Sequence, residues 1–137
     1  MTEVLFVCVH NAGRSQMAEA IFNAEVAKRG LSYLGVSAGT KAGTGVNPAA
    51  LEALNEIGVP VAGLHPKQLT QDMANRAAKI LTMGCGVDEE SCPGRIHVSE
   101  DWALVDPAGK GIEAVREIRD QIHKRVLDLI FDLENGH

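Results

Sequence analysis

Hydrophobic and polar positions along the chain alternate between short β-rich runs and longer stretches with helical spacing. Residues 3–8 form an apolar run typical of a buried strand. The stretch "LSYLGVSAG" contains a second strand that ends in a glycine turn, and "KILTM" predicts a third. "RIHV", near residue 96, is a weaker fourth. The pattern therefore predicts strands that are separated from one another by helices.

Several segments have the spacing of helices. Residues 15–29 carry apolar side chains along one side and lead into a glycine that ends the helix. The next helix begins with Asn47 as the N-cap and Pro48 at the first helical position. "QLTQDMANRAA" predicts a short helix, and the apolar positions from Ile112 to Leu133 predict an amphipathic C-terminal helix.

This alternation favours an α/β fold with a parallel sheet covered on both faces, because parallel strands need crossover connections. The 137 residues fit one domain, spanning 1–137, and no second core is needed. Ligands in such folds bind beyond the carboxyl ends of the strands. Cys8 ends one predicted strand and Cys85 follows another, so we expect two loops distant in sequence to meet at one edge of the sheet.

Composition excludes several function classes. Apolar residues make up 45% and charged residues 23% of the chain, as in ordinary globular proteins. The net charge of -5 contains no long block of like charge and does not suggest nucleic acid as a partner. No apolar stretch approaches the roughly 18 residues of a membrane helix, and the first ten residues make a poor signal peptide. We therefore expect a cytoplasmic protein, in which three cysteines do not form a static disulfide framework.

The stretch "CVHNAGRS", residues 8–15, joins the first strand to the first helix. A loop at this place points backbone N–H groups inward, and the helix dipole adds partial positive charge, so the loop is a ready oxyanion site. We expect the glycine to allow a tight turn, Asn11 to brace the loop or adopt a left-handed conformation, and Arg14 to offer a bidentate fork. The residues expected to bind the anion are Val9, His10, Asn11, Ala12, Gly13 and Arg14.

Cys8 lies at the start of this loop. A helix N-terminus and a nearby cation favour the thiolate over the thiol, so the environment that holds an anion also makes a nucleophile. Ser15 is placed to donate a hydrogen bond to that thiolate. The loop therefore predicts nucleophilic chemistry by Cys8 on a bound oxyanion.

Longer stretches of the chain carry a resemblance to a known family. "VLFVCVHNAGRSQMAEA" is similar to the phosphate-binding loop of low-molecular-weight protein tyrosine phosphatases and of the arsenate reductases that share their fold. "SAGT", "VNPAALEALNEIGV", "LTMGC" and "DWALVDPAGKG" resemble the arsenate-reductase branch, so the resemblance covers essentially the whole chain. It implies a four-stranded parallel sheet flanked by helices, arsenate as substrate, and thioredoxin as reductant for members with three cysteines.

The resemblance also implies roles for individual residues. Cys8 corresponds to the nucleophile, Asp106 to a general acid, and Cys85 and Cys92 to a redox pair, whose spacing matches the thioredoxin-coupled members. In that scheme Cys8 attacks arsenic while Asp106 protonates the departing hydroxide. Cys85 then attacks the sulfur of Cys8 and releases arsenite, and Cys92 attacks Cys85 to regenerate Cys8.

Other interpretations remain open at this level. A tyrosine phosphatase uses the same loop, but such enzymes usually place tyrosines after the Asp-Pro pair, where this chain has "DPAGK". An oxyanion or thiol-redox sensor without turnover is a second alternative. Cys85, Cys92 and His97 lack the close cysteine pairing and fourth ligand of structural zinc sites, so we expect no metal. Trp102 is expected to anchor the core, because a lone tryptophan usually packs there.

One position departs from the family pattern. Some thioredoxin-coupled members bind potassium beside the loop through residues matching Asn11, Glu19 and Ser37, together with a threonine and an aspartate from the segment that reads "LHPKQ" here. His65 and Lys67 stand at those last two positions. We predict that the ammonium of Lys67 replaces potassium and pairs with Glu19, so that activity needs no cofactor and is indifferent to the ion.

Overall fold

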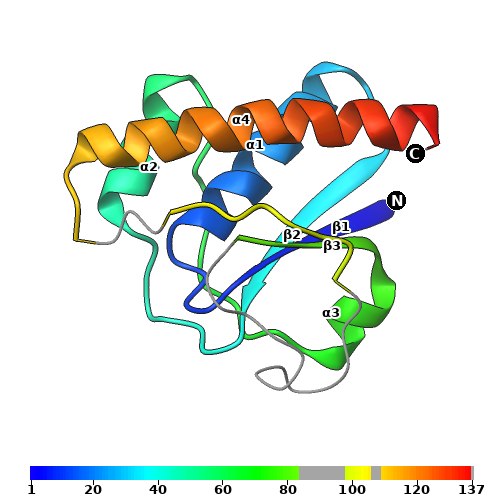
Figure 1. Ribbon diagram of the computed structural model, residues 1–137, viewed down its shortest axis with the longest axis horizontal. Helices are drawn as coiled ribbons and strands as arrows, with labels where there is room; N and C mark the ends of the chain where they lie inside the picture. Colours follow the sequence, from blue (N-terminus) through cyan, green and yellow to red (C-terminus); the bar gives the residue numbers. More distant parts are fainter. Residues whose placement is uncertain (84–97, 106–108, 137) are drawn as a thin grey trace.

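Four parallel strands form the centre of the fold. The computed structural model describes residues 1–83, 98–105 and 109–136 (Figure 1). The strands are β1 (Thr2–Cys8), β2 (Tyr33–Gly39), β3 (Ala77–Thr82) and β4 (Glu100–Asp101), in the order β2-β1-β3-β4. Because β1 pairs with both β2 and β3, its last residue, Cys8, stands in the interior of the sheet at its carboxyl edge.

Helices cover both faces of this sheet, as the sequence predicts. They are α1 (Arg14–Lys28), α2 (Pro48–Glu56), α3 (Gln71–Arg76) and α4 (Ile112–Asn135). Helices α1, α2 and α4 pack together on one face, and α3 lies on the other (Figure 1). No helix in the described ranges is both long and apolar enough to cross a bilayer. The predicted α/β architecture with a four-stranded parallel sheet is confirmed.

Side-chain caps fix where two helices begin. The side chain of Asn47 accepts a 2.9 Å hydrogen bond from the Ala49 N–H, and Pro48 occupies the first helical position of α2. Both features match the sequence prediction. The hydroxyl of Thr70 accepts from the Met73 N–H at 3.2 Å and starts α3.

Strand β1 supplies side chains to both faces of the sheet because successive residues point in opposite directions. Val4, Phe6 and Cys8 belong to the core beneath α1 and α4, whereas Leu5 and Val7 join the smaller core on the other face. The ring of Phe6 lies 5.6 Å from those of Phe22 and Trp102, measured between centroids. Trp102 is 2% exposed, so its predicted role as a core anchor is confirmed.

The fourth strand lies later than "RIHV", the segment that the sequence favours. Of that segment only Val98 is described, and it lies outside β4. The ladder with β3 runs instead through Glu100 and Asp101, and it is flanked by hydrogen bonds from the Ser99 and Trp102 N–H groups, each 2.8 Å long. Burial of Trp102 fixes this register, because an apolar run is a weaker constraint than a large side chain in the core.

Candidate active site

The loop that follows β1 is held from outside by the segment that follows β2. Four of its carbonyl oxygens accept backbone hydrogen bonds of 2.7 to 3.1 Å from residues 40–47, namely those of Cys8, Val9, His10 and Ala12. In a trans peptide the N–H points opposite to the preceding carbonyl. The N–H groups of residues 9, 10, 11 and 13 therefore turn away from residues 40–47 and toward the inside of the loop.

Gly39 makes this close packing possible. It is the last residue of β2 and lies opposite Cys8 in the sheet. A Cβ atom at Gly39 would lie 2.4 Å from the carbonyl oxygen of Val9, a distance that real Cβ atoms do not adopt. The glycine of "SAGT" is therefore required by the loop, since any side chain there would displace the backbone of residues 8–11.

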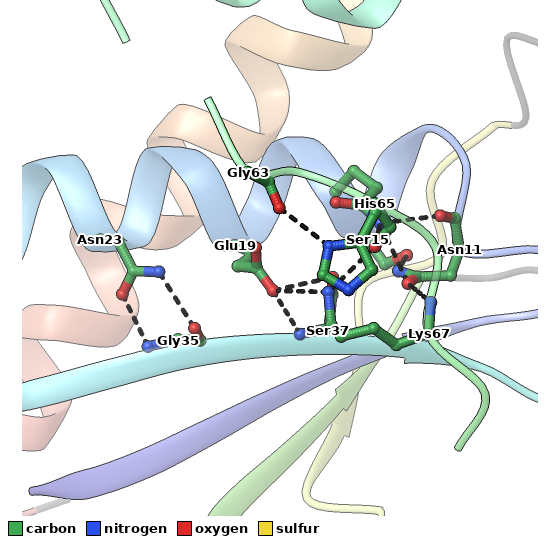
Figure 2. Close-up of polar contacts among 10 residues, drawn as sticks. Asn11, Ser15, Glu19, Asn23, Gly35, Ser37, Gly63, His65 and Lys67 are labelled. Carbon is green, nitrogen blue, oxygen red and sulfur yellow. Dashed lines mark hydrogen bonds and ion pairs between the residues drawn. The ribbon is translucent and has the colours of Figure 1, made fainter. Parts of the chain in front are cut away.

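Asn11 braces the loop from within. It is fully buried and has a φ of 53°, in the left-handed region that asparagine tolerates better than most residues. Its Nδ2 donates to Oγ of Ser15 at 2.8 Å, and its Oδ1 accepts from the Lys67 N–H at 2.9 Å (Figure 2). Both roles that the sequence suggests for Asn11, bracing and a left-handed conformation, are present.

Gln16 is a loop contact that sequence reasoning missed. This fully buried side chain donates from Nε2 to the carbonyl oxygens of Asn11, at 2.9 Å, and His65, at 2.7 Å, and to Oδ1 of Asn11 at 3.0 Å. It therefore joins the loop to the segment that contains Lys67. The hydrophobic pattern gave no signal for it, because a glutamine outside the apolar side of a helix is expected to be exposed.

Arg14 is the first residue of α1 and is 4% exposed. Its Nη1 donates to the carbonyl oxygens of Met83, at 2.9 Å, and Leu104, at 2.8 Å. Its Nη2 lies 3.5 Å from Sγ of Cys8. Two backbone carbonyls thus orient the guanidinium so that its other nitrogen faces the sulfur.

The surroundings of Cys8 favour negative charge on its sulfur. Burial, with 6% of the residue exposed, disfavours a charged sulfur, but Nη2 of Arg14, the first residue of α1, lies 3.5 Å from it. A cation and a helix N-terminus stabilise a thiolate relative to the thiol. The same groups attract a second anion to the inside of the loop.

A salt bridge lies next to the loop (Figure 2). Nζ of Lys67 is 3.3 Å from Oε1 of Glu19 and donates to the carbonyl oxygen of His65 at 3.1 Å. The same Oε1 accepts hydrogen bonds from Ser37, from its N–H at 2.8 Å and from its hydroxyl at 3.0 Å. The Oε1 of Glu19 is therefore shared between the ammonium of Lys67 and the two donors of Ser37.

The aromatic side chains of the protein lie away from the loop. The chain has five aromatic residues, and the structure describes all of them. Phe6, Phe22 and Trp102 are buried in the core. Tyr33 starts β2, at the end of the sheet opposite Cys8, and Phe131 lies near the C-terminal end of α4. None of the five is placed to flank a substrate at the carboxyl edge of the sheet.

Three residues predicted for the site, Cys85, Cys92 and Asp106, lie outside the described residues, as does His97 of the zinc alternative. Their chain neighbours are informative. Met83 precedes Cys85 by two positions, and Leu104 precedes Asp106 by two positions. The two carbonyls that hold Arg14 thus belong to the two segments from which these residues follow.

Sequence and fold together define the class of protein. The family described as low molecular weight phosphotyrosine protein phosphatase matches residues 3–136, so the chain belongs to that family. Within it, the chain is 38% identical over 133 residues to a putative arsenate reductase of Halobacterium salinarum, covering 93% of this chain and 90% of the relative. It is 30% identical over 131 residues to a glutaredoxin arsenate reductase of Synechocystis, covering 95% and 97%.

Solved structures agree with this grouping. An arsenate reductase in a phosphate-binding state superimposes with a TM-score of 0.82 at 31% identity, covering 96% of this chain and 98% of that one. A thioredoxin-dependent arsenate reductase of Corynebacterium glutamicum has a TM-score of 0.77 at 34% identity, covering 100% of this chain and 64% of that one.

Proposed function

We propose that this protein reduces arsenate to arsenite, with Cys8 as the nucleophile. The observation that carries the proposal is the position of the Arg14 Nη2, 3.5 Å from Sγ of Cys8, at a loop whose N–H groups turn inward. Two relatives, which match 93% and 95% of the chain, are named a putative arsenate reductase and a glutaredoxin arsenate reductase. An arsenate ion has the charge and tetrahedral shape that such a site accepts.

The first step is attack on the bound ion. The N–H groups of the loop and the guanidinium of Arg14 hold the arsenate oxygens, while the thiolate of Cys8 forms a bond to arsenic. One oxygen leaves as hydroxide, and we propose that Asp106 supplies the proton that makes it water. The product of this step is a covalent bond between sulfur and arsenic(V).

The next steps transfer electrons among thiols. The thiolate of Cys85 attacks the sulfur of Cys8 and forms a disulfide, and the electron pair of the broken sulfur–arsenic bond reduces arsenic(V) to arsenic(III), which leaves as arsenite. Cys92 then attacks Cys85, forming a second disulfide and returning Cys8 to its thiolate. A dithiol reductant reduces the disulfide between Cys85 and Cys92 and completes the cycle.

Thioredoxin is the reductant that we propose. A structural neighbour of 34% identity is named a thioredoxin-dependent enzyme, and this chain has the three cysteines that such a relay needs. The relative of 30% identity is named for glutaredoxin instead, so the two reductants must be compared directly. We propose the cytoplasm as its compartment, because thiols are kept reduced there.

We propose further that the reaction needs no metal cofactor. A potassium ion next to the loop would need the carboxylate of Glu19, which is 3.3 Å from the ammonium of Lys67. Oxygen ligands suit a hard cation, whereas an ammonium at the same place repels one. The residues present therefore do not fit the ion, and Lys67 supplies the positive charge.

A phosphatase acting on phosphotyrosine is the alternative activity. The shared family and loop favour it, but the position of the five aromatic residues does not, because none is placed to stack on an aromatic ester. The comparison of arsenate with an aryl phosphate therefore separates the two functions.

The experiment is a multiple-turnover assay with arsenate, NADPH, thioredoxin and thioredoxin reductase, with glutaredoxin and glutathione in a parallel series. We expect sustained NADPH consumption with thioredoxin and little hydrolysis of p-nitrophenyl phosphate. Cys8→Ser is expected to abolish reduction while folding is retained, and Asp106→Asn is expected to slow single-turnover reduction by about a hundredfold. Rapid phosphate-ester hydrolysis without arsenate reduction would establish the phosphatase instead.

A further inference from the structure

The carbonyl oxygen of Leu104 is one of the two groups that orient the guanidinium of Arg14. Leu104 lies beyond the last residue of β4, in a stretch with no regular hydrogen-bonding pattern. Its carbonyl oxygen nonetheless accepts a 2.8 Å hydrogen bond from Nη1 of Arg14. The side chain of Leu104 is buried in the core, 4% exposed, and a further interaction directs the chain between β4 and Leu104 toward the guanidinium.

The carboxylate of Asp101 provides that interaction. Its Oδ1 accepts a 2.5 Å hydrogen bond from the hydroxyl of Thr82, on the neighbouring strand. Its Oδ2 accepts a 3.1 Å hydrogen bond from the N–H of Ala103, two residues further along the chain. One side chain thus ties the end of β3 to the turn that follows β4.

That turn is strained at Ala103. The residue has a φ of 45°, in the left-handed region that a Cβ atom disfavours. Trp102, immediately before it, is fixed by its buried ring and by the hydrogen bond from its N–H to the Thr82 carbonyl, 2.8 Å long. The hydrogen bond that Oδ2 of Asp101 accepts from the Ala103 N–H stabilises the left-handed conformation, which reverses the chain and brings the Leu104 carbonyl to Arg14.

We propose that Asp101 is a positioning residue for the anion-binding site, acting through Ala103 and Leu104 on the guanidinium of Arg14. This inference deepens the proposed function and rests on it to the extent that Arg14 binds the oxyanion. The same carboxylate accepts from Thr82, which immediately precedes Met83, so it lies between the two segments whose carbonyls hold Nη1. Without the carboxylate, the hydrogen bond from Nη1 to the Leu104 carbonyl is weakened or lost. The guanidinium is then less well oriented to bind the anion.

The test uses inorganic phosphate as the probe, so that it does not depend on arsenate turnover. Asp101→Ala is expected to weaken phosphate binding, measured by calorimetry, by about tenfold, because a misoriented guanidinium loses its charge-assisted hydrogen bonds. It is also expected to slow the alkylation of Cys8 by iodoacetamide at neutral pH, because the cation beside the sulfur is less well placed. Glu100→Ala, which removes the neighbouring exposed carboxylate of β4, is the matched control and is expected to bind phosphate as the wild type does.

A second substitution separates positioning from general destabilisation. Glycine adopts a left-handed conformation without the help of a side chain, so Asp101→Ala combined with Ala103→Gly is expected to recover most of the phosphate affinity. If Asp101→Ala does not fold, Thr82→Val removes one anchor of the carboxylate while keeping the buried volume, and it is expected to weaken binding in the same direction.

Three results would overturn the proposal. The first is unchanged phosphate affinity and alkylation rate in both Asp101→Ala and Thr82→Val. The second is the absence of any recovery when Ala103→Gly is added. The third is a wild-type protein that binds no phosphate, which would also contradict an oxyanion site at Arg14. Phosphate binding without arsenate reduction would instead reject the proposed activity. In that case the phosphate affinities of the variants still decide the role of Asp101.

Discussion

Lys67 and Glu19 form an ion pair of 3.3 Å beside the loop that carries Cys8. The same lysine holds the loop directly, since its backbone N–H donates to Oδ1 of Asn11 at 2.9 Å. Lys67 therefore contacts the surroundings of the loop through its side chain and the loop itself through its backbone. The ammonium neutralises the carboxylate next to an anion site, and the N–H fixes the left-handed asparagine.

Removing this ammonium is expected to create a dependence on potassium. In Lys67→Met the carboxylate of Glu19 and the carbonyl of His65 lose their cation, and oxygen ligands of this kind can accept a monovalent ion. Arsenate reduction by the variant is expected to rise several-fold when potassium replaces sodium at constant ionic strength, while the wild type does not respond. Lys124→Met, an exposed position on α4, is the control. Equal activation of the wild type by potassium would show that Lys67 does not replace the ion.

Arg14→Lys is expected to be far from conservative. A lysine ammonium cannot donate to both the Met83 and Leu104 carbonyls and still present a planar fork to the anion. We expect kcat/KM for arsenate to fall by about a hundredfold or more. The free energy of unfolding is expected to fall by about 1–3 kcal/mol, because a buried carbonyl loses its partner. Arg125→Lys, on the exposed side of α4, is expected to change neither quantity. Activity within about twofold of wild type would show that the planar guanidinium of Arg14 is not needed to bind the anion.

Cys92→Ser tests the order of the thiol relay. If residues 85–92 were a continuous helix, a rise of about 1.5 Å per residue would place the two Cα atoms about 10 Å apart, beyond the reach of a disulfide. We therefore expect oxidation to change the conformation of residues 83–95. The variant is expected to stop after one turnover with a disulfide between Cys8 and Cys85, identified by peptide mass spectrometry. Sustained turnover with thioredoxin would contradict the relay.

The hydrogen exchange of residues 83–95 provides an independent measurement of that change. Exchange rates are expected to differ between the reduced and the oxidised wild type, because a disulfide between Cys85 and Cys92 constrains the backbone between them. Identical exchange in the two redox states would count against a conformational step.

Stability in acid is expected to depend on Glu25. Burial by itself raises the pKa of this carboxyl, but hydrogen bonds from His123 and Arg29 outweigh it and hold the pKa below the ordinary value of 4.5. A lowered folded-state pKa contributes stability above the unfolded-state value, and the contribution is lost as the pH falls through the folded-state value. Glu25→Gln is therefore expected to be less stable than the wild type at neutral pH and to approach it in acid.

Chemical denaturation at a series of pH values measures this difference. Asp128→Asn, an exposed position on α4, is the matched control and is expected to follow the wild type throughout. A constant difference between Glu25→Gln and the wild type from neutral to acid pH would show that titration of Glu25 does not contribute.

The sequence predicted best the features that depend on residues close together in the chain. The apolar run at 3–8 became β1 because a central parallel strand is buried on both faces, and Asn47 with Pro48 started α2 because caps act within a few residues. The short helix was expected to extend over "QLTQDMANRAA" but covers only Gln71–Arg76. Tertiary pairing decided its end, since Ala77 already pairs with Glu3 in the sheet.

The site was predictable only where side chains carry the chemistry. Cys8, Asn11 and Arg14 stand out by residue type and spacing, and the structure brings Arg14 to Cys8 and Asn11 to Ser15. The partners of Arg14 are backbone carbonyls, and every residue has one, so composition gives no reason to choose Met83 and Leu104. Their role follows from the order of the strands, which sequence pattern alone does not determine.

The span of those two hydrogen bonds has a consequence for how the protein unfolds. Arg14 joins positions that are 69 and 90 residues away along the chain. An anion that needs this guanidinium in place can bind only when both distant segments are folded, so its binding free energy is added to the unfolding of the entire domain. At ligand concentrations well above Kd, each tenfold increase in phosphate should raise the global stability by about 1.4 kcal/mol. Amide protons in β1 and in α4 should then gain protection together, although α4 lies outside the loop.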